Sequence, residues 1–214
     1  YQPNNGESLI VSTMERRYPL GAHLIERGKT GPFGDCVGIF LRDQSSARAV
    51  LRQTSTIVHE CGHGADLANG GIGTDNYIIN LESTLTCAAG DTTSRHGRTF
   101  ARSRLNTDQY ALPACQGPNC DMYRDVYLTG NPDDMNFDSG DQGFNSVLEE
   151  TLQYVNSLAT GFAIHPELFM GGFGVSERDG ILTFLWYVMR YLRMGRTDYP
   201  DAYAFIKGDP CWRE

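Results

Sequence analysis

The sequence lacks long uninterrupted apolar runs and has few positive charges. Its longest apolar stretch, ILTFLWYVM at positions 181–189, ends at Arg190 and has about half the length that a helix needs to cross a bilayer. The 214 residues carry a formal net charge of −8 without a large basic patch. A protein of this charge is a poor partner for nucleic acid or for an anionic membrane. We therefore expect neither partner.

The cysteines lack the paired spacing of a zinc ribbon, which argues against a cysteine-based structural metal site. They lie at positions 36, 61, 87, 115, 120 and 211. An even number in a chain of this size indicates disulfides and an oxidising compartment. CQGPNC (115–120) is a tight Gly-Pro turn, so Cys115–Cys120 is the pair we expect first. The remaining pairings cannot be read from the sequence. Together with a first residue Tyr1 in place of Met, the cysteines predict a secreted, processed protein.

The length suits a single domain over residues 1–214, with a long loop-rich insertion at about 90–143. This insertion is rich in Gly, Asn, Asp and Pro, and a loop of that length inside a compact domain is usually functional or tied by disulfides. We expect a monomer whose partner is a peptide or protein substrate.

Periodicity predicts an α+β domain. DCVGIFLRD (35–43) has the pattern of a buried or edge strand. Residues 45–69 have apolar positions at helical spacing, with Ser45 or Ser46 as the cap. Residues 74–89 fit a second helix, although their β-branched side chains leave a strand open.

Two further helices are expected in the second half of the chain. From Phe144 an apolar stripe that includes Val155, Leu158 and Phe162 recurs at helical spacing. Residues 176–194 are apolar nearly all round, with Ser176 as N-cap, and this composition is typical of a core helix.

The stretch TIVHECGHGAD (56–66) carries the strongest chemical signal. His59 and His63 are four residues apart, so on a helix both imidazoles can reach one tetrahedral ion at about 2 Å. Glu60 can reach a water bound at the open position of such an ion and take its proton. This is the H-E-x-x-H motif of metalloproteases, and it predicts Zn²⁺ bound by the two histidines, with Glu60 as general base.

The residues around the motif support this interpretation. Gly62 and Gly64 flank the second histidine, where each glycine disfavours a helix by roughly 1 kcal/mol. Glycine at these positions predicts that another element packs closely on the motif. Asp66 lies one turn after His63, where its carboxylate is placed to accept a hydrogen bond from a ligand histidine.

A third ligand must come from elsewhere in the chain. The metzincin pattern requires histidine at position 69 and glycine at position 66, where this chain has Asn69 and Asp66. A carboxylate is therefore expected. Glu82 follows His63 by nineteen positions but lies in a segment of doubtful helicity. Glu149 and Glu150 lie in a secure helix, and Glu150 is favoured.

These residues resemble the gluzincins. The spacing of Glu82 is similar to that of thermolysin-like and aminopeptidase-type members, although the Asn that precedes the glutamate in those enzymes is absent. H-E-x-G-H-x-x-D, present as His59 to Asp66, resembles the lethal-factor and Pro-Pro endopeptidase group, in which a later helix carries the ligand glutamate just before apolar residues. Glu150, followed by TLQYV, fits that position better than Glu149.

The resemblance covers two short helices and implies a small zincin-like metallopeptidase domain. The implied domain has an active-site helix, a glutamate-bearing helix and a small sheet. The family's tyrosine just before the glutamate helix is absent here, where the chain reads SGDQGF. Tyr123 and Tyr127 are candidates to replace it as hydrogen-bond donors to the transition state.

The acidic loop DDMNFDSGDQG (133–143) is not an EF-hand, because the twelfth position counted from Asp134 is Asn145 where a glutamate is needed. A solvated loop is the favoured interpretation, with calcium binding as the alternative.

The sequence thus predicts a secreted zinc endopeptidase that uses a metal-activated water. The segment 35–43 would supply the sheet edge along which a peptide lies. The alternative is a secreted zinc-containing binding or effector domain without catalysis, in which a protein ligand closes the fourth coordination position.

Overall fold

The computed structural model is mostly helical, and the part of the chain that it describes contains one two-stranded antiparallel sheet. The described residues are 2, 4–70, 74–89, 102–111, 122–128, 143–168 and 177–214. Helices with a small sheet agree with the α+β class at a coarse level.

The described residues fall into two compact units. The first comprises Tyr1–Gly71, Asn76–Leu85 and Leu152–Asp179. The second comprises Ile72–Asp75, Thr86–Thr151 and Gly180–Glu214.

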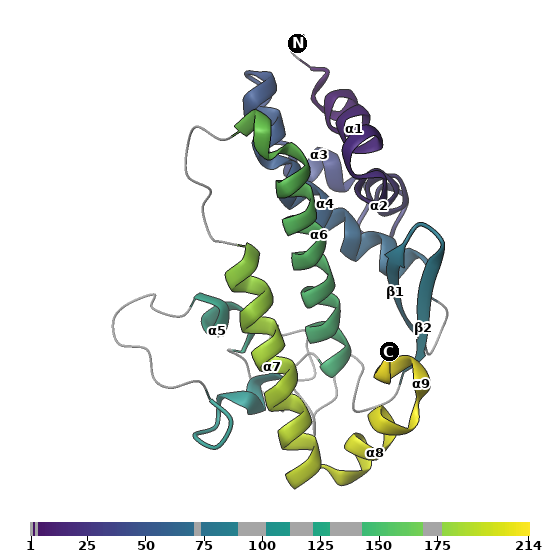
Figure 1. Cartoon of the computed structure of the whole chain (residues 1–214), viewed down its shortest axis with the longest axis vertical. Helices are drawn as coiled ribbons and strands as arrows, with labels where there is room; N and C mark the ends of the chain where they lie inside the picture. Colours follow the sequence, from purple (N-terminus) through teal and green to yellow (C-terminus); the bar gives the residue numbers. More distant parts are fainter. Residues whose placement is uncertain are drawn as a thin grey trace. The chain divides into compact units, whose positions relative to one another are not determined.

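The first unit begins with two helices, α1 (Gly6–Arg17) and α2 (Pro19–Lys29), drawn in purple in Figure 1. Proline at the first position of α2 separates them, since its fixed φ suits a helix start and it needs no backbone donor there. Ile10 and Met14 of α1 and Leu24 of α2 are fully buried, and both helices contact α4. They supply one side of the core against which the motif helix packs.

Residues 36–40 form a short helix, α3 (Cys36–Phe40), and the predicted strand over 35–43 is therefore wrong. Asp35 caps this helix, with its Oδ1 accepting from the Gly38 N–H at 3.1 Å. The disulfide Cys36–Cys61 ties α3 to α4. A short apolar run fits a strand and a helix equally well, and the cap and the crosslink decide in favour of the helix.

The motif lies in α4 (Ala47–Ala68), which confirms the helix predicted for this segment. Ser46 is the N-cap, and its Oγ accepts from the Ala49 N–H at 3.1 Å. The apolar positions of the predicted stripe that are buried include Val50, Ile57 and Val58. The helix thus turns one face to α1, α2 and α3.

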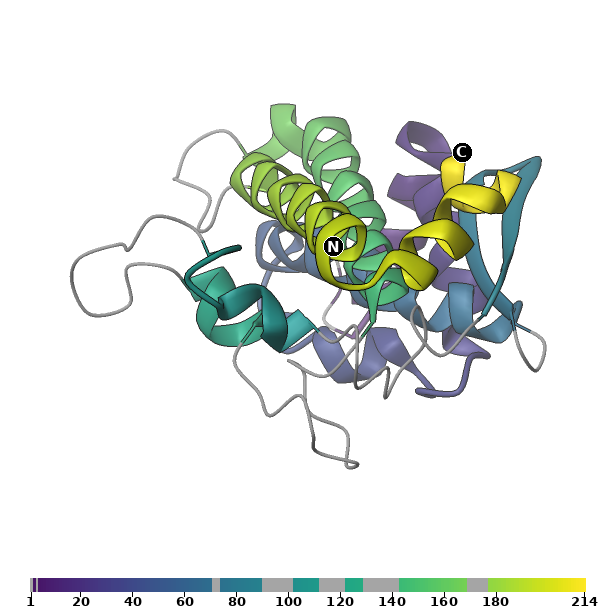
Figure 2. The same cartoon turned by 90° about the horizontal axis from the view of Figure 1, so that it is seen from below.

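Residues 74–89 form a hairpin of β1 (Thr74–Asn80) and β2 (Ser83–Ala88), not the helix that we expected first (Figure 2). β-Branched residues recur along both strands, and these favour a pleated backbone. The turn is fixed by Asn80, whose Oδ1 accepts from the Glu82 N–H at 2.9 Å. The strand that the sequence left open is therefore the observed structure.

Helix α6 (Phe144–Leu168) is present as predicted, but its expected apolar face is partly wrong. Val155, Leu158 and Phe162 are exposed, Phe162 by 84% of its surface. Apolar residues are buried near its two ends, whereas the buried residues in its middle are polar: Gln153, Asn156, Ser157 and Thr160. The reason is that this face meets polar groups of α4, as the metal centre shows below.

Helix α7 (Glu177–Asp198) belongs to the second unit, except for its first three residues, which belong to the first. The second unit also contains four shorter elements. These are η1 (Arg102–Asn106), α5 (Met122–Tyr127), α8 (Pro200–Gly208) and α9 (Pro210–Arg213). In α7, Phe184, Tyr187 and Tyr191 are buried, whereas Leu182 and Met189 are 59% and 64% exposed. The expected all-round burial of this helix is therefore wrong for one face.

The predicted disulfides are confirmed in part. Cys36–Cys61 crosslinks the first unit and Cys87–Cys211 the second. Both are non-local pairings that the sequence could not give. The expected pair Cys115–Cys120 lies outside the described residues, as do most of the predicted insertion, Ser176 and the acidic loop up to position 142.

Candidate metal centre

Helix α4 places the two motif histidines one turn apart on the same face. The ring centroids of His59 and His63 are 4.8 Å apart, and the planes are nearly perpendicular at 77°. His59 is 9% exposed and His63 is half-buried. Two imidazoles at this spacing on one helix face are suited to hold a metal ion.

Glu150 joins the two histidines. One ligand atom from each of His59, His63 and Glu150 can be chosen so that all three lie within 4.8 Å of one another. Metal–ligand bonds of about 2 Å put the ligand atoms of a tetrahedral site roughly 3 Å apart, so one ion would draw the three side chains closer together. The group could therefore hold a metal ion.

The other two candidate glutamates lie outside this group in the part of the chain that the structure describes. Glu82 is exposed in the turn between β1 and β2, and Glu149 is half-buried next to Glu150 on α6. Which glutamate binds a metal stays a prediction, and Glu150 is the one that could form a metal-binding group with the two histidines.

The predicted base, Glu60, follows His59 on α4 and is half-buried. The H-E-x-x-H motif has its glutamate next to the first histidine, and the structure places both residues on one helix. Its role as a base belongs to the proposed function.

Helix α6 also holds the ring of His59. The Tyr154 ring meets the His59 ring edge-on, with centroids 5.0 Å apart. Nδ1 of His59 lies 3.2 Å from Oγ of Ser157 in a buried contact. Neither residue was predicted from the sequence, although Glu150, Tyr154 and Ser157 have the spacing of one helix face, which is the signal that could have indicated them.

A buried chain of hydrogen bonds runs beside the metal group. Tyr18 Oη donates to Oδ1 of Asn156 at 2.8 Å, and Asn156 Nδ2 donates to Oε1 of Gln153 at 3.0 Å. Gln153 Nε2 donates to Oδ2 of Asp66 at 2.9 Å. Burial raises the pKa of Tyr18 to about 12, so its hydroxyl remains a donor throughout the neutral range.

Asp66 is the last residue in this series of hydrogen bonds, and it also binds the β1–β2 hairpin. Its Oδ1 accepts from the backbone N–H of Ile78 in β1 at 2.8 Å. Its Oδ2 accepts from Gln153, and the expected orientation of a ligand histidine by Asp66 stays a prediction. Asp66 therefore joins α4 to β1 and α6.

The glycines of the motif are explained by close packing, as the sequence predicted. A Cβ on Gly62 would lie 1.9 Å from Oε1 of Gln153. On the α2 side, a Cβ on Gly28 would lie 2.1 Å from the Cys61 carbonyl oxygen, and one on Gly64 would lie 3.0 Å from the Gly28 oxygen. The motif helix is thus enclosed by backbone on one side and by a buried amide on the other.

Tyr123 and Tyr127 belong to α5, in the second unit. Their rings stack with centroids 6.3 Å apart, and Tyr127 meets Phe184 edge-on at 4.7 Å. These are packing contacts, and a role of either hydroxyl toward a transition state stays a prediction. The candidate calcium loop lies outside the described residues, apart from position 143.

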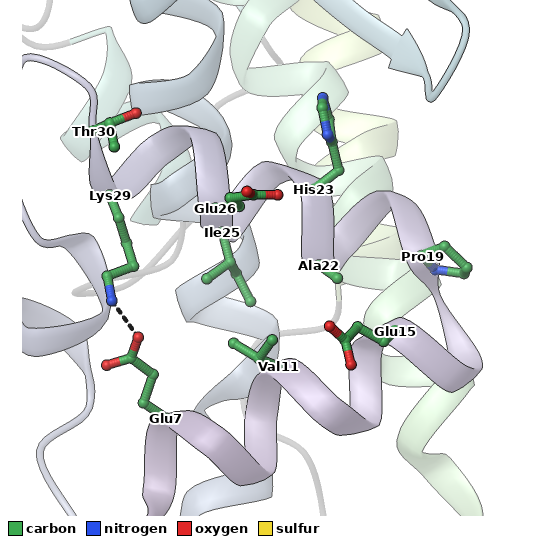
Figure 3. Close-up of a pocket in the computed structure, with 10 residues that line it drawn as sticks. All are labelled: Glu7, Val11, Glu15, Pro19, Ala22, His23, Ile25, Glu26, Lys29 and Thr30. Carbon is green, nitrogen blue, oxygen red and sulfur yellow. Dashed lines mark hydrogen bonds and ion pairs between the residues drawn. The ribbon is translucent and has the colours of Figure 1, made fainter.

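A separate hollow of about 600 Å³ lies between α1 and α2 (Figure 3). Its apolar lining includes Val11 and Ile25, and Glu7 forms an ion pair with Lys29 at one end. The hydrogen bond from Lys29 to Glu7 raises the pKa of the lysine. None of the lining residues belongs to the metal group.

No family model, curated protein or solved structure matches the chain. The resemblance to gluzincins therefore depends on the motif residues alone. Among the described residues, no helix combines the length and apolar character needed to cross a membrane.

Proposed function

We propose that this protein is a secreted, zinc-dependent endopeptidase of the gluzincin type with a zincin-like fold. The observation that carries the proposal is the convergence of His59, His63 and Glu150, with Glu60 adjacent to the first ligand. Two imidazoles and one carboxylate are a donor set of catalytic zinc sites, because they leave a fourth position for water.

The roles of the residues follow from this arrangement. Bound zinc would lower the pKa of a coordinated water toward about 7 and polarise a substrate carbonyl. Glu60 would accept the proton of that water and then deliver it to the leaving amine. His59, His63 and Glu150 would hold the ion, while Tyr154 and Ser157 keep the His59 ring in place.

Secretion is supported by the two disulfides, which persist in oxidising compartments. A peptide or protein substrate is supported by the H-E-x-x-H chemistry, which is directed at a carbonyl carbon. The predicted sheet edge at 35–43 is not available for a peptide, since this segment is the helix α3.

The experiment compares wild type with Glu60→Gln. We expect about one zinc per chain in both proteins by elemental analysis, and cleavage of a peptide library by wild type alone, because Glu60 is a base and not a ligand. Gln keeps the shape of the side chain and removes its basicity. Equal cleavage by both proteins would exclude this role for Glu60. A wild type that holds zinc but cleaves no peptide would favour the non-catalytic binding domain.

A further inference from the structure

Helices α4 and α6 are joined by two reciprocal bonds between serines. Oγ of Ser55 donates to the carbonyl oxygen of Ser157 at 3.0 Å. Oγ of Ser157 donates to the carbonyl oxygen of Ser55 at 3.4 Å. Both residues belong to the first unit, and Ser157 is buried, with 4% of its surface exposed.

The same Ser157 hydroxyl faces His59. A serine hydroxyl has one proton and two lone pairs. A Ser157 proton directed to the Ser55 carbonyl, 3.4 Å away, leaves the Ser157 oxygen to meet Nδ1 of His59 as an acceptor, over 3.2 Å. The acceptor requires a proton on Nδ1 of His59.

We propose that Ser157 is a positioning residue that fixes the tautomer of His59, with the proton on Nδ1 and the lone pair of Nε2 directed to the metal. A neutral imidazole has one donor and one acceptor nitrogen, so the other tautomer would present an N–H to the ion. The consequence for metal binding rests on the proposed function, whereas the tautomer itself does not.

Burial makes this contact effective. His59 is 9% and Ser157 is 4% exposed, so little water is available to replace the bond. A buried N–H that loses its acceptor is destabilised, and this redistributes two tautomers of similar energy. Partners of this kind typically change metal affinity by about 10–100-fold when they are removed.

The main rival explanation is that Ser157 only links α4 to α6 through the pair of hydrogen bonds with Ser55. Ser55 offers a matched control. Its hydroxyl donates the other hydrogen bond between the two helices, while its backbone carbonyl accepts the bond from Ser157. Oγ of Ser55 also lies 3.0 Å from Oε1 of Glu177, so its single proton is shared between two acceptors. Ser55→Ala removes these bonds and leaves the acceptor of Ser157 in place.

The experiment uses the full chain and two readouts. The first is ¹⁵N NMR of the histidines in zinc-free protein, in mildly alkaline buffer where free imidazole is neutral. We expect the proton of His59 on Nδ1 in wild type and in Ser55→Ala, and a mixture of tautomers in Ser157→Ala. Wild type with its proton on Nε2 would overturn the proposal.

The second readout is zinc affinity by competition with a chelator. We expect Ser157→Ala to weaken zinc binding about 10–100-fold, with Ser55→Ala and Ser157→Thr close to wild type. An equal loss of zinc affinity in Ser55→Ala would show that the linkage of the two helices is the cause, and it would overturn the proposal. If Ser157→Ala does not fold, Ser157→Thr and the wild-type spectrum still decide. A wild type that binds no zinc would refute the proposed function, and the NMR result would stand apart from that failure.

Discussion

Gln153 of α6 occupies the space that a side chain at position 62 of α4 would need. A Cβ on Gly62 would lie 1.9 Å from Oε1 of Gln153, far inside van der Waals contact. The amide cannot retreat freely, since it donates to Asp66 and accepts from Asn156. The glycine in the middle of the motif is therefore required by a neighbour on another helix.

Gly62→Ala should destabilise the protein in spite of the better helix propensity of alanine. Overpacking costs about 1–3 kcal/mol, and displacement of Gln153 also breaks buried hydrogen bonds, so we expect a net loss of about 2 kcal/mol. Gly161→Ala in α6 is the control, because nothing lies within 4 Å of a Cβ there. It should gain up to about 1 kcal/mol. Denaturant unfolding measures both, and equal stability of the two variants would contradict the close contact.

The third ligand can be identified by chelator titration of three variants. Glu150→Gln should lower zinc affinity and activity together, because a carboxylate ligand is lost. Glu149→Gln and Glu82→Gln are controls on the same helix and in the β1–β2 turn, and they should hold zinc like wild type. Retention of zinc by Glu150→Gln with loss in Glu82→Gln would place the protein nearer the short-spaced gluzincins.

The raised pKa of Asp75 predicts that the stability of the protein falls as pH rises. Burial raises its pKa above the ordinary value of 3.8, although its Oδ1 accepts from Asn145 at 2.9 Å. Between the unfolded and the folded pKa the native state binds more protons, so stability is lost as pH rises through that interval. Asp75→Asn keeps an acceptor for Asn145 and should stabilise the protein at neutral pH by about 1 kcal/mol.

The control for this prediction has the opposite sign. Hydrogen bonds from the side chain and from the backbone N–H of Ser45 lower the pKa of Asp43. The contribution of Asp43 to stability is therefore present at neutral pH and is lost as pH falls through the lowered pKa. Thermal unfolding should be measured from acid to neutral pH. The fall of stability with rising pH should be smaller in Asp75→Asn than in wild type. Identical pH profiles for wild type and Asp75→Asn would contradict the assignment.

Non-reducing peptide mapping should give three disulfides. Cys36–Cys61 and Cys87–Cys211 are present in the structure, which leaves Cys115 and Cys120 to pair with each other. Replacing Cys87 and Cys211 by alanine should destabilise more than replacing Cys36 and Cys61, since the closed segments differ in sequence separation, 124 against 25. The chain-entropy model gives about 5 against about 3.5 kcal/mol. A reversed order, or free thiols at 115 and 120, would contradict this.

The sequence predicted what depends on local spacing. The helix that carries His59 and His63 followed from its apolar stripe and from a serine cap, and Gly62 indicated a close neighbour before the neighbour was known. The glutamate helix was predicted from periodicity, and Glu150 came from a motif resemblance. These features depend on residues within a few turns of one another.

The remainder depends on contacts between distant segments. The polar buried face of α6 could not be predicted, because burial of Ser157 and Gln153 is decided by α4 and not by their own helix. The segment 74–89 fitted a helix as well as a strand, and its β-branched residues favour the pleated backbone that the hairpin has. The cystine partners, Cys36 with Cys61 and Cys87 with Cys211, have no local signature.

The buried hydrogen bonds between α4 and α6 also limit which substitutions this protein can accept. Apolar contacts tolerate exchange among side chains of similar volume, whereas Asp66, Gln153 and Asn156 accept and donate in a fixed order. A change at one position leaves a buried group without its bond, so substitutions should be accepted in matched sets. Among homologues, we expect glycine at position 62 to co-vary with a long amide at position 153, and a residue other than glycine there to be accompanied by a smaller partner.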